Sequence, residues 1–556
     1  MNLFKQFCIF LVLFLCVLQA GSDPEGKVKA LDSFMRRFLG EEQSEPFKAG
    51  GIKSGFRYAL QVSYFGNYLN QSLLSRYLEK VQERPDREKS LTTPSGHFVL
   101  HWDESGSDHV PLMDISGNGV PDYIDSAAVI FDHVWQIEID LLGFQAPLSE
   151  DGKPVAHYDI YFSNLKKYGW YGITQPEKAF EIGSELKYTS YIEIDCNFDS
   201  LYFNTAGLAG VRVTAAHEFN HAIQLCYNNH PDEDYFAGDL FFYEMTSTCM
   251  EEIVYPGIND YYQYLPLIFD EVSNSPFDRY GSDDTYPYGN ALYLLMLSKQ
   301  YGARICPEIW QEIKSYPVLP ALERVLNRKG VSWLESLSEY GVWLYYTGNR
   351  TRGDNYFTDA RVYGQVTVEP DDTYDYRHLF EIKKEITQNA VCYLNITNVA
   401  SPELQMGIRA NDANRQGFHL LQRSAASPLY PANKQISLQI SEPDTICLVL
   451  TNAINSSSTF AVTQEKIDIR IDVYPNPLIV KSGTANLSFL NLPANAVVTI
   501  YSILGTKITK LKPEHDRPVF YWNLRNDRGI SVASGVYLYH VEGEKITKSG
   551  KFIIIR

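Results

Sequence analysis

The strongest chemical signal in this chain is a run of five residues, His217-Glu218-Phe219-Asn220-His221. The surrounding stretch carries apolar residues at helical spacing, so the two histidines, four residues apart, lie on one face of a helix. Two imidazoles placed in this way can bind one zinc ion, and the carboxylate of Glu218 then lies beside the open position of the metal. The pattern predicts a zinc hydrolase in which His217 and His221 are ligands and Glu218 is the general base.

A catalytic zinc ion needs a third protein ligand. A third histidine shortly after the second is excluded, because position 224 is Gln and position 227 is Tyr. The next predicted helix carries Glu244 and Glu251, which are seven residues apart and therefore share a face. Weaker alternatives from the residues alone are His230, Asp234 and Asp239.

The ten residues from Tyr243 to Glu252 (YEMTSTCMEE) resemble the glutamate-bearing second helix of the gluzincins, the thermolysin-like peptidases. The resemblance implies that Glu244 is the third zinc ligand. Glu251 or Glu252 is then either the acceptor that orients a histidine or part of a solvated helix face, and the sequence leaves both possibilities open.

Residues 91–350 as a whole resemble a family of secreted bacterial zinc metalloproteases. The shared landmarks are residues 117–123 (GNGVPDY), 158–161 (YDIY), 168–172 (YGWYG) and the two helices that carry the predicted ligands. Family members more often have an aromatic residue, Gly and Trp where this chain has Asn220, Met245 and Cys249. These departures spare the predicted ligands and affect the surrounding pocket.

The implied reaction is metal-assisted hydrolysis of a peptide bond. Zinc lowers the pKa of its water toward about 7, and Glu218 accepts the proton and passes it to the leaving amine. Tyr286 and Tyr288 are candidate donors to the developing oxyanion because they precede the next helix. Two competing functions remain, a hydrolase of a non-peptide amide or ester, and an inactive surface adhesion or glycan-binding protein on a metallopeptidase scaffold.

Residues 114–125 have the spacing of a calcium-binding loop, with Gly119 at its sixth position. The predicted calcium ligands are the side chains of Asp114, Ser116, Asn118, Asp122 and Asp125 and the carbonyl of Val120. Calcium would have a structural role here, fixing the start of the following helix. The alternative is an ordinary turn rich in Asp, Asn and Gly that binds no ion.

At 556 residues the chain is too long for one hydrophobic core, and we expect several domains. Residues 1–20 have the pattern of a secretory signal peptide, and residues 21–90 form a helical accessory region or propeptide. Residues 91–350 are expected to form an α+β zincin-like metallopeptidase domain, with helices over 125–142, 208–228, 239–254, 288–301 and 320–347. A β-sandwich at 355–465 and an immunoglobulin-like all-β domain at 472–556 follow.

Residues 472–556 resemble the type A sorting domain of the type IX secretion system. The landmarks are residues 474–477 (YPNP), 500–505 (IYSILG), 522–523 (WN), 533–539 (ASGVYLY) and 551–556 (KFIIIR). This resemblance implies export by the signal peptide, then passage across the outer membrane by the type IX machinery, giving a secreted or cell-surface protein.

Charge and cysteine content exclude several other functions. The formal net charge of -18 disfavours nucleic acid as a partner, because phosphate recognition needs concentrated Lys and Arg. After the signal peptide, no stretch approaches the ~20 apolar residues that a spanning helix needs. The six later cysteines are widely spaced and form no CxxC pair, so a disulfide framework is not expected. Cys392 and Cys447, within one β-domain, could form a bridge.

Overall fold

The structure is a computed structural model that divides into two compact units, Met1–Thr367 and Val368–Arg556. It describes residues 24–42, 52–149, 152–183, 185–227, 239–281, 284–376, 381–399, 403–422, 426–439, 444–464, 471–480, 485–490, 492, 496–512, 520–543 and 546–556. The predicted signal peptide at 1–20 lies outside the described residues. Each unit is described by itself below.

A five-stranded mixed sheet is the centre of the first unit. Its strands are β1 (Lys89–Thr92), β2 (Phe98–Trp102), β3 (Tyr158–Ser163), β4 (Gly172–Ile182) and β5 (Glu185–Asp195), in the order β1-β2-β3-β5-β4. The central strands β2, β3 and β5 run parallel, whereas β1 and β4 are antiparallel to their neighbours. Strand β4 is therefore an edge of the sheet, open to pairing along one side.

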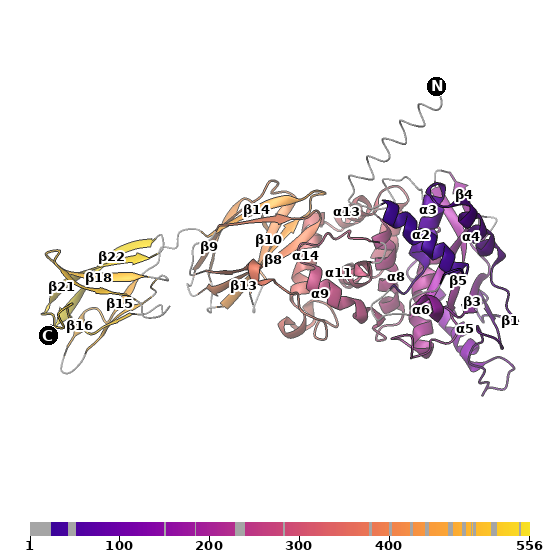
Figure 1. Cartoon of the computed structure of the whole chain (residues 1–556), viewed down its shortest axis with the longest axis horizontal. Coiled ribbons are helices and arrows are strands. Elements are labelled where there is room, and N and C mark those ends of the chain that lie inside the picture. Colours follow the sequence, from indigo (N-terminus) through magenta and orange to yellow (C-terminus); the bar gives the residue numbers. More distant parts are fainter. Residues whose placement is uncertain are drawn as a thin grey trace, which may run out of the picture. The chain divides into compact units, whose positions relative to one another are not determined.

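Helices cover both faces of this sheet (Figure 1). On one face, α5 (Asp122–Trp135) and α6 (Gly207–Gln224) pack on the strands, and Phe219 of α6 contacts the rings of Phe98 and Tyr158. Because successive strand residues point to opposite faces, Tyr161 of β3 lies on the other side. There it packs with helices α2 (Pro24–Phe38), α3 (Phe56–Phe65) and α4 (Gln71–Glu83).

The N-terminal helices share a hydrophobic core with the sheet. Phe34 and Tyr58 belong to the same buried cluster as Trp170, Ile173 and Tyr191. The region that the sequence marks as accessory is thus packed against the second face of the sheet within the first unit.

The remaining helices of the first unit begin and end at different residues from those that the sequence predicts. They are α8 (Leu240–Val254), α9 (Leu265–Glu271), α10 (Tyr286–Asn290), α11 (Leu292–Tyr301), α12 (Ile305–Ile313), α13 (Val318–Arg328) and α14 (Trp333–Tyr345). The single helix expected over 320–347 is wrong. Gly330 adopts a φ of 80°, which ends α13, and Ser332 starts α14 by forming a capping box with Glu335.

The second unit begins with a two-sheet sandwich, and the expectation of an all-β C-terminal region is confirmed. One sheet has the order β11-β10-β13-β8-β6 and the other β12-β9-β14-β7. The strands are β6 (Thr373–Asp375), β7 (Glu381–Ile386), β8 (Ala390–Val399), β9 (Glu403–Arg409), β10 (Gln416–Leu421), β11 (Tyr430–Pro431), β12 (Lys434–Gln439), β13 (Asp444–Asn452) and β14 (Ser458–Gln464).

The possible disulfide between Cys392 and Cys447 is not formed. The two residues lie on adjacent strands, but Cys392 pairs with Leu450 and Cys447 pairs with Asn395. This register places the cysteines on opposite faces of the sheet, since side chains alternate along each strand. Cys392 belongs to the core of the sandwich.

The last part of the chain is a second sandwich, with sheets β15-β17-β20 and β16-β22-β21-β18-β19. Its strands are β15 (Asp472–Tyr474), β16 (Leu478–Ile479), β17 (Leu487–Leu490), β18 (Val497–Ser502), β19 (Lys507–Leu511), β20 (Phe520–Trp522), β21 (Gly535–Gly543) and β22 (Ile546–Ile555). Trp522 and Phe552, both within the predicted sorting landmarks or next to them, are buried in its core.

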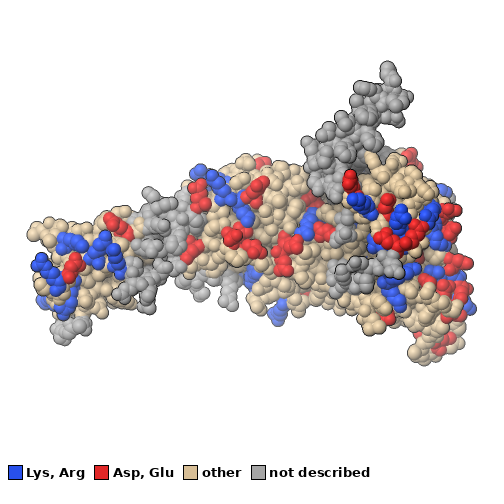
Figure 2. All heavy atoms as spheres, viewed as in Figure 1, with Lys and Arg blue, Asp and Glu red and all other residues tan. Residues whose placement is uncertain are grey.

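Charged side chains of both signs are interspersed over most of the face shown in Figure 2, including the part formed by the N-terminal helices. None of the helices in the described ranges has both the length and the apolar character needed to cross a membrane.

Candidate metal centre

Helices α6 and α8 bring three predicted ligands together. His217 Nε2 lies 3.1 Å from His221 Nε2, and Glu244 Oε2 lies 3.2 Å from the first of these nitrogens and 3.5 Å from the second. All three side chains are buried. Within the described part of the chain, this is the one group of three or more His, Cys, Asp or Glu side chains whose ligand atoms converge in this way.

The arrangement fits a tetrahedral metal ion. Zinc bonds of 2.0–2.1 Å place neighbouring ligand atoms about 3.3–3.4 Å apart, which is close to the three separations observed. Both carboxylate oxygens of Glu244 are buried, and no donor among the described residues reaches them with hydrogen-bond geometry. A buried carboxylate without a donor costs free energy unless a cation lies beside it. The cluster can therefore hold a metal ion through His217, His221 and Glu244.

A buried ionic network orients His217. Its Nδ1 lies 2.7 Å from Oε1 of Glu251, and the other oxygen of Glu251 accepts a hydrogen bond of 2.8 Å from Lys53 Nζ. Lys53 also donates to Asp260, at 2.6 Å. Glu251, rather than Glu252, is thus the acceptor that orients a histidine. Such partners fix the ring and its tautomer for metal binding.

His221 is oriented by neutral groups instead. Its Nδ1 lies 2.8 Å from Oε1 of Gln224 and 3.1 Å from the hydroxyl of Ser247. The amide nitrogen of Gln224 donates in turn to Asn220 Oδ1 and to the carbonyl of Tyr243. These bonds join α6 to α8, so they fix both the second histidine and the helix that carries Glu244.

Glu218 follows His217 on α6, and its side chain lies against the edge strand β4. Its Oε2 accepts a hydrogen bond of 2.8 Å from the hydroxyl of Thr174. Gly172 makes room for this carboxylate, because a Cβ atom at that position would come within 2.7 Å of Glu218 Cγ. A side chain at position 172 would therefore displace the predicted general base.

Opposite charges dominate the electrostatics of the centre. Burial lowers the pKa of His217, but the carboxylates of Glu244 and Glu251 outweigh this effect and raise it to about 9. Burial raises the pKa of Glu244, yet the imidazoles of His221 and His217 together hold it well below its usual value. In the absence of a cation, the two carboxylates thus retain a proton on His217, which is the position that a metal ion would take.

Residues from outside the predicted catalytic domain cover the centre. The ring of Phe56, at the start of α3, stacks on the imidazole of His221 with centroids 3.9 Å apart. The buried guanidinium of Arg57 lies 5.9 Å from the ring of Tyr288. Sequence reasoning missed Lys53, Phe56 and Arg57, because no motif marks them and they are distant from the ligands along the chain.

The two candidate oxyanion donors, Tyr286 and Tyr288, differ in their position relative to the metal cluster. The ring of Tyr288 lies 6.0 Å from that of His217, and its buried hydroxyl has no hydrogen-bond partner among the described residues. Tyr286 instead packs under the guanidinium of Arg279, at 4.8 Å. Only Tyr288 is therefore placed to act on a substrate at the cluster.

The alternative ligands do not join the cluster. Asp239 accepts a hydrogen bond of 3.0 Å from the backbone of Val318, and it is absent from the group of converging ligand atoms. His230 and Asp234 lie outside the described residues.

Comparisons with known proteins do not assign a family. No family model matches the chain, and no curated protein matches it. Among solved structures, PorZ of Porphyromonas gingivalis, a surface component of its type IX secretion system, is 26% identical over 19% of this chain and 15% of its own, with a TM-score of 0.15. Dimeric latent PorU of the same organism is 16% identical over 33% of this chain and 19% of its own, with a TM-score of 0.14.

The adhesin domain of Epf from Streptococcus pyogenes is 9% identical over 32% of this chain and 77% of its own, with a TM-score of 0.17. This chain spans less than a fifth of the length of PorZ and of PorU. TM-scores this low define no common fold, so the chemistry of the centre is argued from the chain's own residues.

The predicted calcium loop is closed by its own hydrogen bonds. Asp114 accepts from the backbone nitrogens of Gly117 at 2.7 Å and Gly119 at 2.9 Å, and Asn118 donates to Asp125 at 2.9 Å. The backbone bond from Gly119 is the largest cause that lowers the pKa of Asp114. The loop is exposed, and its carboxylates form no converging group of the kind found at His217. Calcium binding by this loop stays a prediction.

Calorimetric titration of the full chain with calcium tests this prediction. If the loop binds calcium as extracellular modules do, the dissociation constant should be about 10⁻⁴–10⁻³ M. Asp114→Asn should weaken binding, because it removes a charged ligand, whereas Asp132→Asn, on the following helix α5, should not. Equal heats of binding for all three proteins would contradict a site in this loop.

A further buried carboxylate, that of Glu138, contacts helix α6 through Asn220. Glu138 is fully buried, and its Oε2 accepts a hydrogen bond of 2.9 Å from the amide of Asn220 on α6. Its other carboxylate oxygen has no partner among the described residues. Burial raises the pKa of Glu138 well above its usual value, and the bond from Asn220 only partly offsets this. Burial therefore favours the protonated form of Glu138.

Glu138→Gln, which imitates the protonated acid, should stabilise the chain increasingly as the pH rises. A carboxyl whose folded pKa is raised contributes its full stability below the unfolded pKa of about 4.3 and loses it as the pH rises toward the folded pKa. The advantage of the variant should grow by roughly 1.4 kcal/mol per pH unit over that window. Urea unfolding at pH 5 and pH 8 measures it, and an advantage independent of pH would contradict a raised pKa of Glu138.

Proposed function

We propose that the first unit is a zinc-dependent endopeptidase with a zincin-like fold, carried by a secreted or cell-surface protein. The observation that supports this most is the convergence of His217, His221 and Glu244. Glu218 follows His217 directly on helix α6. An inactive scaffold has no need to keep all four, because each buried charged group costs free energy without its partner.

Zinc at this centre would supply Lewis-acid activation of a water molecule and of the substrate carbonyl. Glu218 accepts the proton of the attacking water and then donates it to the leaving amine. The hydroxyl of Thr174 holds one oxygen of Glu218, which leaves the other oxygen for the proton. The hydroxyl of Tyr288 donates a hydrogen bond to the developing oxyanion. This hydroxyl has no other hydrogen-bond partner among the described residues.

The edge of the sheet favours a peptide over a small ester or amide. Gly172 and Thr174 belong to the edge strand β4 and flank Glu218. An extended peptide can add to such an edge through backbone hydrogen bonds, which hold the scissile bond in register. A small ester has no backbone to use these groups.

For export, we propose that residues 472–556 are a sorting domain read by the type IX secretion machinery. The support is the sequence resemblance together with a sandwich whose core includes Trp522 and Phe552. Deleting these residues in a bacterium that has this system should retain the protein in the periplasm. A deleted form that still reached the cell surface would contradict the proposal.

Metal content and hydrolysis together test the enzymatic proposal. Mass spectrometry of the purified full chain should find one zinc per molecule, and Glu244→Ala should lose it. Glu252→Ala, on the same helix and one residue from Glu251, is the matched control that keeps the zinc. Because the centre is buried, casein hydrolysis is assayed with and without chelator both before and after proteolytic nicking between α4 and β1.

The outcomes separate the candidate functions. Zinc with chelator-sensitive hydrolysis supports the endopeptidase. Zinc without hydrolysis in either state favours the binding protein on a metallopeptidase scaffold. No zinc in the wild-type chain contradicts both the metal site and the enzyme.

A further inference from the structure

A short segment from the N-terminal region, residues 53–57, adds to the edge of β4 at the metal centre. Ser54 and Gly172 form a parallel β-bridge. Gly55 donates its backbone N–H to the carbonyl of Gly172 at 3.1 Å, and Tyr171 donates to the carbonyl of Lys53 at 2.8 Å. These are the hydrogen bonds of strand addition, made at the position where the edge passes Glu218.

The same segment closes the centre with its side chains. Phe56 is fully buried on the imidazole of His221, and Lys53 fills the space between Glu251 and Asp260. His217, His221 and Glu244 are 0% exposed and Glu218 is 1% exposed. A peptide cannot reach the cluster, or pair with the start of β4 at Gly172, while this segment is in place.

Resting on the proposed peptidase function, we infer that residues 53–57 are an autoinhibitory segment and that the chain folds in a latent form. The segment occupies the strand edge and stacks on a metal ligand, so its departure opens both the substrate position and the metal. A segment with a purely structural role would pack on the sheet without covering the four residues that carry the chemistry.

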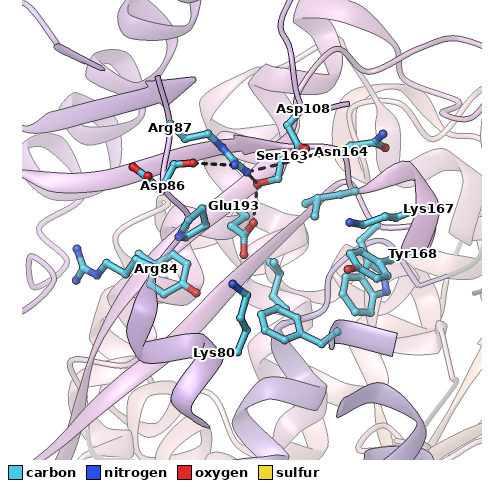
Figure 3. Close-up of a pocket in the computed structure, with 16 residues that line it drawn as sticks. Lys80, Arg84, Asp86, Arg87, Asp108, Ser163, Asn164, Lys167, Tyr168 and Glu193 are labelled. Carbon is cyan, nitrogen blue, oxygen red and sulfur yellow. Dashed lines mark hydrogen bonds and ion pairs between the residues drawn. The ribbon is translucent and has the colours of Figure 1, made fainter. Parts of the chain in front are cut away.

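The connection between this segment and the catalytic sheet offers a place for activation. The N-terminal helices end with α4, and residues 84–88 lead from there to β1. A hollow of about 360 Å³ lies along this seam, and its lining includes Lys80, Arg84, Tyr168 and Glu193 (Figure 3). Asp86, which also lines it, is exposed, so a protease can reach the linker there.

Two polar anchors hold the linker around that position. Arg84 pairs with Asp159 and Glu177, and Arg87 donates to the hydroxyl of Ser163 at 2.6 Å. Water can replace such partly exposed contacts at small cost. A cut next to Asp86 therefore breaks the covalent tie between the inhibitory segment and β1 without touching the metal ligands.

The test uses the zinc-loaded full chain in three forms: intact, cut at a specific protease site inserted after Asp86, and carrying Gly55→Val. A Cβ atom at position 55 would lie 2.5 Å from Cδ1 of Ile173, so the larger side chain forces the segment away from β4. Gly66→Val is the matched control, because its Cβ atom meets only Leu74, at 3.4 Å. The probe is a fluorescent peptide hydroxamate, which binds zinc independently of hydrolysis.

We expect the cut chain and Gly55→Val to bind the hydroxamate at least about tenfold more tightly than the intact chain, and to hydrolyse casein. Gly66→Val should behave as the intact chain does. Equal hydroxamate binding by the intact, cut and Gly55→Val forms overturns the inference, as does no binding by any of them. Tighter binding after opening without hydrolysis supports the autoinhibitory segment and contradicts the peptidase function.

Discussion

Glu218→Gln should lower the rate of peptide hydrolysis by about 10²–10⁴-fold while one zinc per chain is retained. Glu218 is not among the three converging ligands, so its replacement leaves the metal site intact. The amide oxygen introduced by the substitution still accepts the hydrogen bond from Thr174, which preserves the local packing. What the variant loses is the ability to accept a proton from water.

The comparison is made on the opened chain, with zinc content measured on the same samples. Glu138→Gln is the matched control, since it makes the same chemical change at another buried glutamate that contacts α6. It should keep both zinc and activity. Full activity in Glu218→Gln would mean that another group moves the proton, and loss of zinc would mean that Glu218 is needed for the site itself.

The metal ligands and the acceptor Glu251 could be predicted from the sequence, because each pair of residues lies within one helix. The four-residue spacing of His217 and His221 places both on one helix face, and the seven-residue spacing of Glu244 and Glu251 directs both toward His217. The mixed first part and the all-β later part of the chain also follow from the periodicity of apolar residues. These patterns repeat within one helix or strand.

The rest depends on contacts between distant segments. Lys53 meets Glu251 across 198 residues, and neither residue has a neighbour pattern that identifies the other. Predicting that Phe56 covers the centre would require knowing which strand is the edge of the sheet. The periodicity of apolar residues does not give the strand order. The break at Gly330 was missed because of a local pattern. Apolar residues continue at helical spacing from α13 into α14, so the sequence predicts one helix where the structure has two.

The network around Lys53 explains how the latent form can be both stable and reversible. Lys53 is 1% exposed and balances two buried carboxylates, Glu251 and Asp260. While the segment is in place, this pairing fixes Glu251 and, through it, His217. When the segment leaves, water reaches both carboxylates, so neither is left buried without a partner.

Lys53→Met in the intact chain should therefore be strongly destabilising. It leaves Glu251 and Asp260 buried without their cation, and breaking a buried pair in this way costs about 3–5 kcal/mol. The free energy of unfolding of the first unit, measured by urea at pH 8, should fall by that amount. Lys80→Met, on the exposed side of α4, is the control and should change it by less than about 1 kcal/mol.

A triple variant distinguishes loss of charge balance from loss of packing. Lys53→Met combined with Glu251→Gln and Asp260→Asn removes all three charges, so it should recover most of the stability that Lys53→Met alone loses. Zinc affinity should still fall by about 10–100-fold, because a neutral amide at position 251 is a weaker acceptor for His217 than the carboxylate. If the triple variant were as unstable as Lys53→Met, the packing of the lysine stem, and not its charge, would be what holds the inhibitory segment in the centre.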